Sequence, residues 1–196
     1  MPEFDIARSA VLVMDYQNGV VANFPDAAEI MARVSKVLDS ARRARIPVVY
    51  IVVSFQEGFP EIGPKSNFRM IKERMGHAFQ GEGHQVHPAL APKPGEPVIS
   101  KKRVSAFAGS DLDLYLRSHD IDHLVLMGIA TSGVVLSTAR QAFDMDYKMT
   151  IISDGCADGD PEVHRVLMEK IFARSATVQT AADFLASLGE HVAQSL

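Results

Sequence analysis

The sequence lacks several features that would assign a chain to a particular class of protein. Cys156 is its only cysteine, which excludes an internal disulfide framework and favours a reducing compartment. No apolar run approaches the roughly 18 residues that a membrane span needs. The first residues do not combine a basic stretch with an apolar one, so no secretory signal is predicted. These absences predict a cytoplasmic protein with no membrane partner.

The chain also lacks a strong charge of either sign. Its 196 residues carry a formal net charge of −4, and acidic and basic residues alternate without forming a charged tail. This gives no electrostatic reason to expect nucleic acid as a partner. Hydrophobic residues make up 47% of the chain, which is typical of a globular protein that can bury a core. We predict a single domain over residues 1–196.

What the sequence does contain is a regular alternation of two patterns. Short apolar runs predict buried strands at residues 10–14, 47–53, 98–100, 124–128, 149–153 and 176–178. Apolar residues at helical spacing predict helices at residues 26–45, 112–117, 132–143, 161–173 and 181–194. Strands that alternate with helices predict an α/β fold with a parallel sheet covered on both faces.

One long segment, about residues 54–97, interrupts the alternation. It is rich in Gly and Pro, with a short helix predicted near residues 66–74. A loop of this length in a compact domain is usually functional or packs against a partner.

Three places at the predicted strand ends attract attention, because ligands of parallel sheets bind at the carboxyl ends of strands. Asp15 follows the first strand, Lys101 follows the third, and the turn after Gly128 follows the fourth. Lys102 is a rival to Lys101, but neighbouring side chains of a strand point to opposite faces, so only one of the two can reach the site.

These places coincide with the motifs of a known family. Residues 11–18 (VLVMDYQN), 98–107 (VISKKRVSAF), 128–138 (GIATSGVVLST) and 153–158 (SDGCAD) resemble, in order, four segments of the isochorismatase-like (cysteine hydrolase) superfamily. The resemblance runs from about residue 8 to residue 184 and favours Lys101 over Lys102. It implies a three-layer α/β/α sandwich with a six-stranded, mostly parallel sheet, and a homo-oligomer, either a dimer or a tetramer.

The resemblance also implies a chemistry. In the family an aspartate handles protons, a lysine lowers the pKa of a cysteine, and the thiolate attacks an amide or imide carbonyl. Backbone N–H groups at the start of the following helix would hold the oxyanion. A cis peptide beside this turn would map to Ile129–Ala130. Asp15 and Lys101 are both present in this chain.

The cysteine is missing. Val134 stands at its position, and a shift of one residue would place Gly133 there, so neither alignment supplies a nucleophile. Some members of the family, the isochorismatases proper among them, are understood to work without the cysteine and to cleave a vinyl ether, with the aspartate as general acid. Asp15 would then need a raised pKa, and Lys101 would orient it or bind a substrate carboxylate.

We therefore predict a hydrolase of a small polar, carboxylated molecule, with vinyl-ether hydrolysis favoured. Two alternatives stay open: a non-catalytic binding protein that keeps the pocket, and an amide hydrolase with another nucleophile. Cys156, Ser132 and Ser137 are the residues that could replace the cysteine. The more economical interpretations are a buried inert thiol for Cys156, a helix cap for Ser132 and a packed side chain for Ser137.

Further residues are candidates for contact with the substrate: Asn18, Phe55, Phe107, Ile129, Ala130, Ser132 and Gly133. Asn18 could instead shape the turn after the first strand, and the phenylalanines could pack in the core or between subunits. Nicotinamidase-like members carry a zinc motif with histidines after the second strand, where this chain has residues 54–59 (SFQEGF). His84 and His87 lie in the long loop and are predicted to be ordinary solvated residues. We predict no metal and no organic cofactor.

Overall fold

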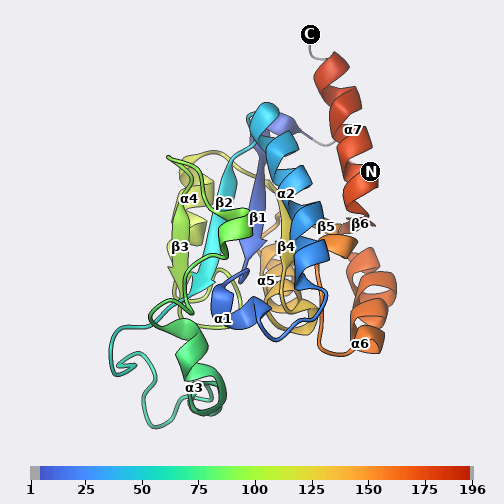
Figure 1. Ribbon diagram of the computed structural model, residues 1–196. Coiled ribbons are helices and arrows are strands. Elements are labelled where there is room, and N and C mark those ends of the chain that lie inside the picture. Colours follow the sequence, from blue (N-terminus) through green and yellow to red (C-terminus); the bar gives the residue numbers. More distant parts are fainter. Residues whose placement is uncertain (1–4, 195–196) are drawn as a thin grey trace.

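The structure of the chain, a computed structural model, describes residues 5–194 and contains a six-stranded sheet in which every neighbouring pair is parallel (Figure 1). The strand order is β3-β2-β1-β4-β5-β6. This confirms the predicted α/β/α fold. The bounds are β1 Ser9–Met14, β2 Val48–Val53, β3 Val98–Lys101, β4 His123–Gly128, β5 Lys148–Ile152 and β6 Thr177–Gln179.

Helices cover both faces of the sheet, which is why β1, β2 and β4 are buried along their whole length. On one face lie α2 (Ala27–Arg43) and α7 (Ala181–Gln194). On the other lie α4 (Leu112–Ser118) and α5 (Leu136–Asp144), together with the turns that continue α6 (Pro161–Val166). Side chains of β1 alternate between the two cores: Val11 and Val13 face α2, whereas Leu12 and Met14 face α5.

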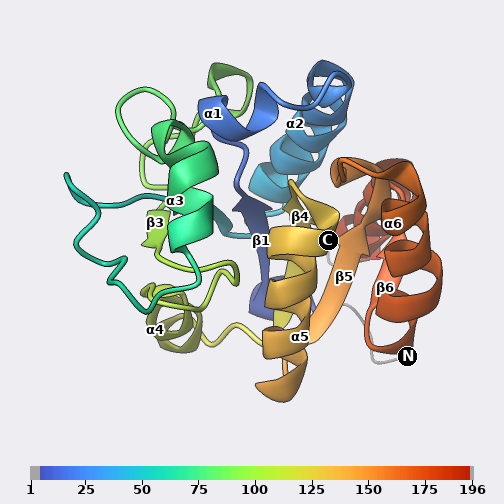
Figure 2. The same ribbon diagram turned by 90° about the horizontal axis from the view of Figure 1, so that it is seen from below.

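Two short helices lie beyond the carboxyl ends of the strands, where the sheet is seen from below in Figure 2. The long loop contributes α3 (Arg69–Met75), close to the predicted position, and the turn after β1 forms α1 (Asn18–Val21). The sequence analysis missed α1, because four residues are too few to show a helical period. Both helices stand at the edge of the sheet where parallel α/β proteins bind ligands.

No helix among residues 5–194 is both long and apolar enough to cross a membrane. This agrees with the lack of long apolar runs in the sequence.

Candidate active site

Asp15 is the first residue after β1, and its backbone is held in an unusual conformation. Its φ angle is +61°, in the left-handed region that few non-glycine residues adopt. Its N–H donates to the carbonyl of Ile51 at 2.9 Å, which continues the pairing between β1 and β2. The conformation turns the chain away from the sheet at this point, and such backbone strain is concentrated at functional sites.

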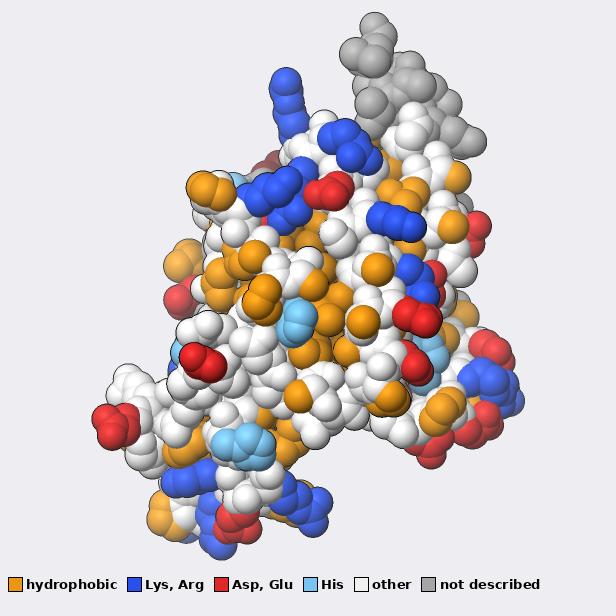
Figure 3. Space-filling model, in the orientation of Figure 1, with side chains coloured by type: hydrophobic (Ala, Val, Ile, Leu, Met, Phe, Trp, Pro, Cys, Tyr) orange, Lys and Arg blue, Asp and Glu red, His pale blue; other side chains and the backbone are white. Residues whose placement is uncertain are grey.

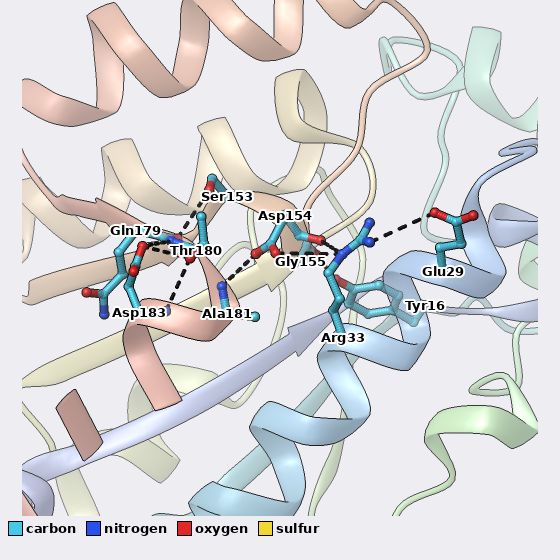
Figure 4. A network of polar contacts seen from close by, with 10 residues as sticks. All are labelled: Tyr16, Glu29, Arg33, Ser153, Asp154, Gly155, Gln179, Thr180, Ala181 and Asp183. Atoms are coloured by element: carbon cyan, nitrogen blue, oxygen red, sulfur yellow. Dashed lines mark hydrogen bonds and ion pairs between the residues drawn. The ribbon is translucent and has the colours of Figure 1, made fainter. Parts of the chain in front are cut away.

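The residue after Asp15 anchors this turn to the neighbouring layers. The Tyr16 hydroxyl donates to the carbonyl of Gly155, in the turn after β5 (Figure 4). In the same network Arg33 of α2 donates from Nε to the carbonyl of Asp154 at 2.9 Å, and the Asp154 carboxylate accepts the first N–H of α7 at 2.7 Å. The end of β1 is therefore tied to β5 and both helices of one face.

Lys101 reaches Asp15 across the end of β2, the strand that separates β1 from β3. Lys101 Nζ lies 2.8 Å from Asp15 Oδ2 and donates to the Val104 carbonyl at 2.6 Å. The side chain of Lys102 points elsewhere and donates from Nζ to the Ser54 carbonyl at 2.5 Å. The structure thus brings Asp15 together with Lys101 and not with its rival, as strand alternation requires.

The two carboxylate oxygens of Asp15 have different surroundings. Oδ2 forms the ion pair with Lys101, whereas Oδ1 is buried and has no hydrogen-bond partner among the described residues. Asp15 is 7% exposed, and burial raises the pKa of its carboxyl group more than the Lys101 ammonium lowers it. The pKa of Asp15 is therefore raised above its ordinary value, and Oδ1 is the oxygen that can carry a proton.

The turn after β4 places Val134 beside this pair. The Ile129–Ala130 peptide is cis, as the resemblance implies. Val134 lies in the first turn of the helical segment that begins at Thr131, and its side chain is 2% exposed. Gly128 allows the close approach, because a Cβ on it would lie 3.2 Å from Val134 Cγ1 and 3.0 Å from the Met14 carbonyl oxygen.

The first backbone N–H groups of this helical segment already have partners. The N–H of Thr131 donates to the Ala157 carbonyl at 2.7 Å, and that of Ser132 donates to Asp158 Oδ2 at 2.6 Å. The N–H of Gly133 donates to the Ala130 carbonyl at 3.1 Å. These three groups are not available to an oxyanion. The structure also corrects the expected cap, because Ala130 occupies the N-cap position and the Ser132 side chain makes no capping bond.

These residues open into a cavity of about 460 Å³ at the carboxyl end of the sheet. We call Asp15, Lys101 and Val134 its floor; the turn residues Ile129, Ala130 and Gly133 lie next to them. The remaining lining residues are Val20, Asn23, Phe24, Val53, Phe68, Ile71, Arg74, Met75, His77, Phe79, Arg103, Val104 and Gly159. Within the described part of the chain, no lining residue carries a hydroxyl or a thiol.

Four predicted contact residues do not line this cavity. The Asn18 amide donates to the Glu82 carbonyl at 3.0 Å and so shapes the turn. Phe55 packs in an aromatic cluster with Phe59, Phe68 and Phe79. Phe107 stacks on Tyr147 in the core of the opposite face, with ring centroids 5.8 Å apart. Ser132 is exposed outside the cavity.

The alternative nucleophiles also lie outside the cavity. Ser137 borders a separate, open depression. Cys156 is 4% exposed, and burial raises the pKa of its thiol to about 12, so it carries almost no thiolate at neutral pH. In the long loop, His84 accepts a bond at its carbonyl from Gln17, and His87 Nδ1 accepts the N–H of Ala89 at 3.2 Å.

The sequence analysis missed most of the cavity roof and one charged residue of its wall. The roof residues belong to α3 or directly precede it: Phe68, Ile71, Arg74 and Met75. They lie in the long loop, where no periodic sequence pattern predicts the course of the backbone. Arg103 had no usable signal either, because it lies two residues beyond the end of β3, where strand alternation no longer fixes the direction of a side chain.

Comparison with known proteins assigns the family. Residues 9–183 match the isochorismatase domain, so the chain belongs to the isochorismatase family of hydrolases. The uncharacterized isochorismatase family protein YwoC of Bacillus subtilis is 28% identical, over 92% of this chain and 94% of that protein. Ureidoacrylate amidohydrolase RutB of Caulobacter segnis is 30% identical, over 95% of this chain and 88% of that protein.

Solved structures agree with this assignment. An isochorismatase family protein from Burkholderia thailandensis superposes with a TM-score of 0.83 at 28% identity, over 96% of this chain and 98% of that one. N-carbamoylsarcosine amidase from Thermoplasma acidophilum superposes with a TM-score of 0.75 at 28% identity, over 89% of this chain and 96% of that one. The resemblance recognised from the four motifs is confirmed.

Proposed function

We propose that this hydrolase cleaves a vinyl ether in a small carboxylated molecule, with Asp15 as the general acid. The observation that carries the proposal is Asp15 Oδ1, a buried carboxylate oxygen without a partner, in a cavity whose described lining carries no hydroxyl or thiol group. A buried polar atom without a hydrogen bond is rare and calls for an explanation. A proton held there for the substrate is such an explanation.

The reaction needs only a proton and a water molecule. Asp15 Oδ1 transfers its proton to the terminal carbon of the vinyl group, and the π electrons form the new C–H bond. The cation that results is an oxocarbenium ion, which a water molecule captures while its spare proton returns to Asp15. The hemiketal then releases the alcohol and a ketone, which is pyruvate when the vinyl group carries a carboxylate.

Each floor residue has a role in this scheme. Lys101 stabilises the Asp15 carboxylate at the moment when the proton leaves, through the contact at 2.8 Å. The raised pKa of Asp15 keeps a fraction of the acid form at higher pH than an ordinary aspartate would. Val134 adds an apolar surface that cannot trap the oxocarbenium ion.

Relatives that are amide hydrolases define the competing reaction. Covalent amide hydrolysis needs a nucleophile, and the described lining residues include no serine, threonine or cysteine. We therefore expect no ammonia release from N-carbamoylsarcosine or ureidoacrylate. Measurable release would favour an amide hydrolase that activates water directly.

The test is pyruvate release from isochorismate, coupled to lactate dehydrogenase. We expect release by the wild type, and a loss of at least about 100-fold in Asp15→Asn, because general acid catalysis contributes about 10²–10⁴-fold. Asp144→Asn is the matched control, since Asp144 is exposed at the end of α5 and should leave the rate unchanged. No release from the wild type would remove isochorismate as the substrate. Release that survives in Asp15→Asn would remove Asp15 as the acid.

A further inference from the structure

Basic side chains other than Lys101 line the cavity without an acidic partner among the described residues. Arg74 and His77 line it from α3 and the turn that follows, and Arg103 lines it from the segment after β3. Asp15 is the single carboxylate of the described lining and already pairs with Lys101. Neither arginine forms an ion pair within 4.0 Å in the described part of the chain. The space-filling view shows Lys and Arg side chains at the end of the molecule that carries α3 (Figure 3).

Arg103 is held in place by contacts that do not neutralise its charge. Its Nη1 donates to the Lys102 carbonyl at 2.6 Å, and its Nη2 donates to the Glu61 carbonyl at 3.3 Å. The guanidinium carbon lies 5.4 Å from the ring centroid of Phe68. A guanidinium has five N–H donors, so three remain for a ligand. A fixed, uncompensated guanidinium beside apolar residues is suited to a carboxylate.

Lys101 is less suited to the same task. Its side chain is 1% exposed, and two of its three donors are directed at Asp15 and the Val104 carbonyl. A substrate carboxylate that displaced Asp15 from Lys101 would leave two carboxylates to share one ammonium. The arginines therefore provide the better anion site in this cavity.

We infer that Arg103, together with Arg74, binds the carboxylate of the substrate on the α3 side of the cavity and so directs the reacting carbon toward Asp15. The claim that the reacting carbon is directed toward Asp15 rests on the proposed function. The existence of the anion site does not. The ligand class is a small monoanion with an apolar body, because most of the other lining residues are aliphatic or aromatic. Arg74 is exposed and should contribute less than the half-buried Arg103.

The experiment compares benzoate with benzamide, which have the same shape and differ in charge, by isothermal titration calorimetry. We expect the wild type to prefer benzoate by at least about tenfold, as a charge-assisted hydrogen bond implies. In Arg103→Gln the preference for benzoate should fall to about twofold. In Arg74→Gln it should be about threefold smaller than in the wild type. Arg69→Gln is the matched control, because Arg69 belongs to the same helix but does not line the cavity, and its preference should equal that of the wild type.

A second measurement covers the case in which Arg103→Gln does not fold. An increase in salt from about 0.05 to about 0.5 M should weaken benzoate binding by the wild type and leave benzamide binding unchanged. Equal binding of the two probes by the wild type would overturn the inference. So would a preference that survives in Arg103→Gln but disappears in Lys101→Met, since the anion would then be held by Lys101. Neither probe contains a vinyl ether, so this result is independent of pyruvate release and of the role of Asp15 as an acid.

Discussion

The floor and the roof of the cavity are built in different ways. The floor residues Asp15, Lys101 and Val134 each lie at the end of a strand or in the turn that follows one, and all three are buried. Neighbouring strands fix their backbones through parallel ladders. A floor of this kind can hold two ionisable groups 2.8 Å apart with little freedom to rearrange.

The roof, by which we mean Phe68 and α3, depends on its own loop. No residue of α3 is buried, and its side-chain bonds go to nearby residues: Lys72 Nζ to the Gly58 carbonyl at 3.3 Å and Arg69 Nη1 to the Pro64 carbonyl at 3.0 Å. Phe68 connects the roof to the sheet through Phe55, two residues after β2, with ring centroids 6.3 Å apart. We therefore expect the floor to set the chemistry, and we expect the roof to select the substrate and to open.

The largest expected effect concerns the reactivity of the floor. Val134→Cys should install a thiol beside Lys101, where a nearby cation favours the thiolate. The thiol of Cys156 has a pKa of about 12, against an ordinary value of about 8.5, so the new thiol should react with iodoacetamide at neutral pH at least about 100-fold faster. Mass spectrometry of the labelled peptides measures both rates in one sample. Equal, slow labelling of both thiols would mean that position 134 does not face the floor.

The second effect concerns the ion pair. Lys101→Met leaves the Asp15 carboxylate buried without its cation, so we expect a loss of about 3 kcal/mol in the free energy of unfolding near neutral pH. The folded-state pKa of Asp15 is already raised and should rise further in the variant. A group with a raised folded pKa contributes stability at low pH that is lost as the pH rises through that pKa. The loss relative to the wild type should therefore grow as the pH rises through the folded-state pKa of Asp15.

The same variant tests the role of Asp15 as an acid. If residual pyruvate release is measurable, its decline with rising pH should shift to higher pH, because the acid form persists longer. The other charged or titratable groups that line the cavity are Arg74, His77 and Arg103, and Lys101→Met leaves all three in place. Lys102→Met is the control, since Lys102 binds the Ser54 carbonyl and not Asp15, and it should leave the pH profile unchanged. A pH-independent stability loss in Lys101→Met would contradict the ion pair.

The difference between floor and roof also explains what the sequence could predict. Asp15, Lys101 and the turn at 128–135 follow apolar runs, and the parallel sheet brings the ends of such runs to one edge. The period of a strand predicted that only one of Lys101 and Lys102 could reach the site, and the family resemblance favoured Lys101. No such rule predicts the roof residues. In the segment 54–97 the position of a side chain depends on its contacts with residues that are distant in the sequence.

The aromatic residues show the same limit in detail. Phe55 and Phe107 both follow strands closely, and their sequence contexts do not distinguish a cavity wall from a core. Phe55 packs under the roof, and Phe107 packs on the opposite face, because beyond a strand end the alternation no longer fixes which face a side chain takes. Tertiary packing decided these positions, and local patterns carry no information on it.

The smallest expected effect concerns the roof itself. Met75 lines the cavity from α3 and is half-buried, so Met75→Ala should lower the free energy of unfolding by less than about 1 kcal/mol. The same change should weaken benzoate and benzamide binding alike by about threefold, because it removes apolar contact and no charge. Met70→Ala is the matched control, since Met70 is 53% exposed on the same helix, lies outside the cavity lining and should change neither quantity. A loss of about 2–5 kcal/mol in Met75→Ala, the range for a truncated core residue, would show that the roof is packed as firmly as the floor. Substrate selection would then have to reside in a fixed cavity and not in a roof that opens.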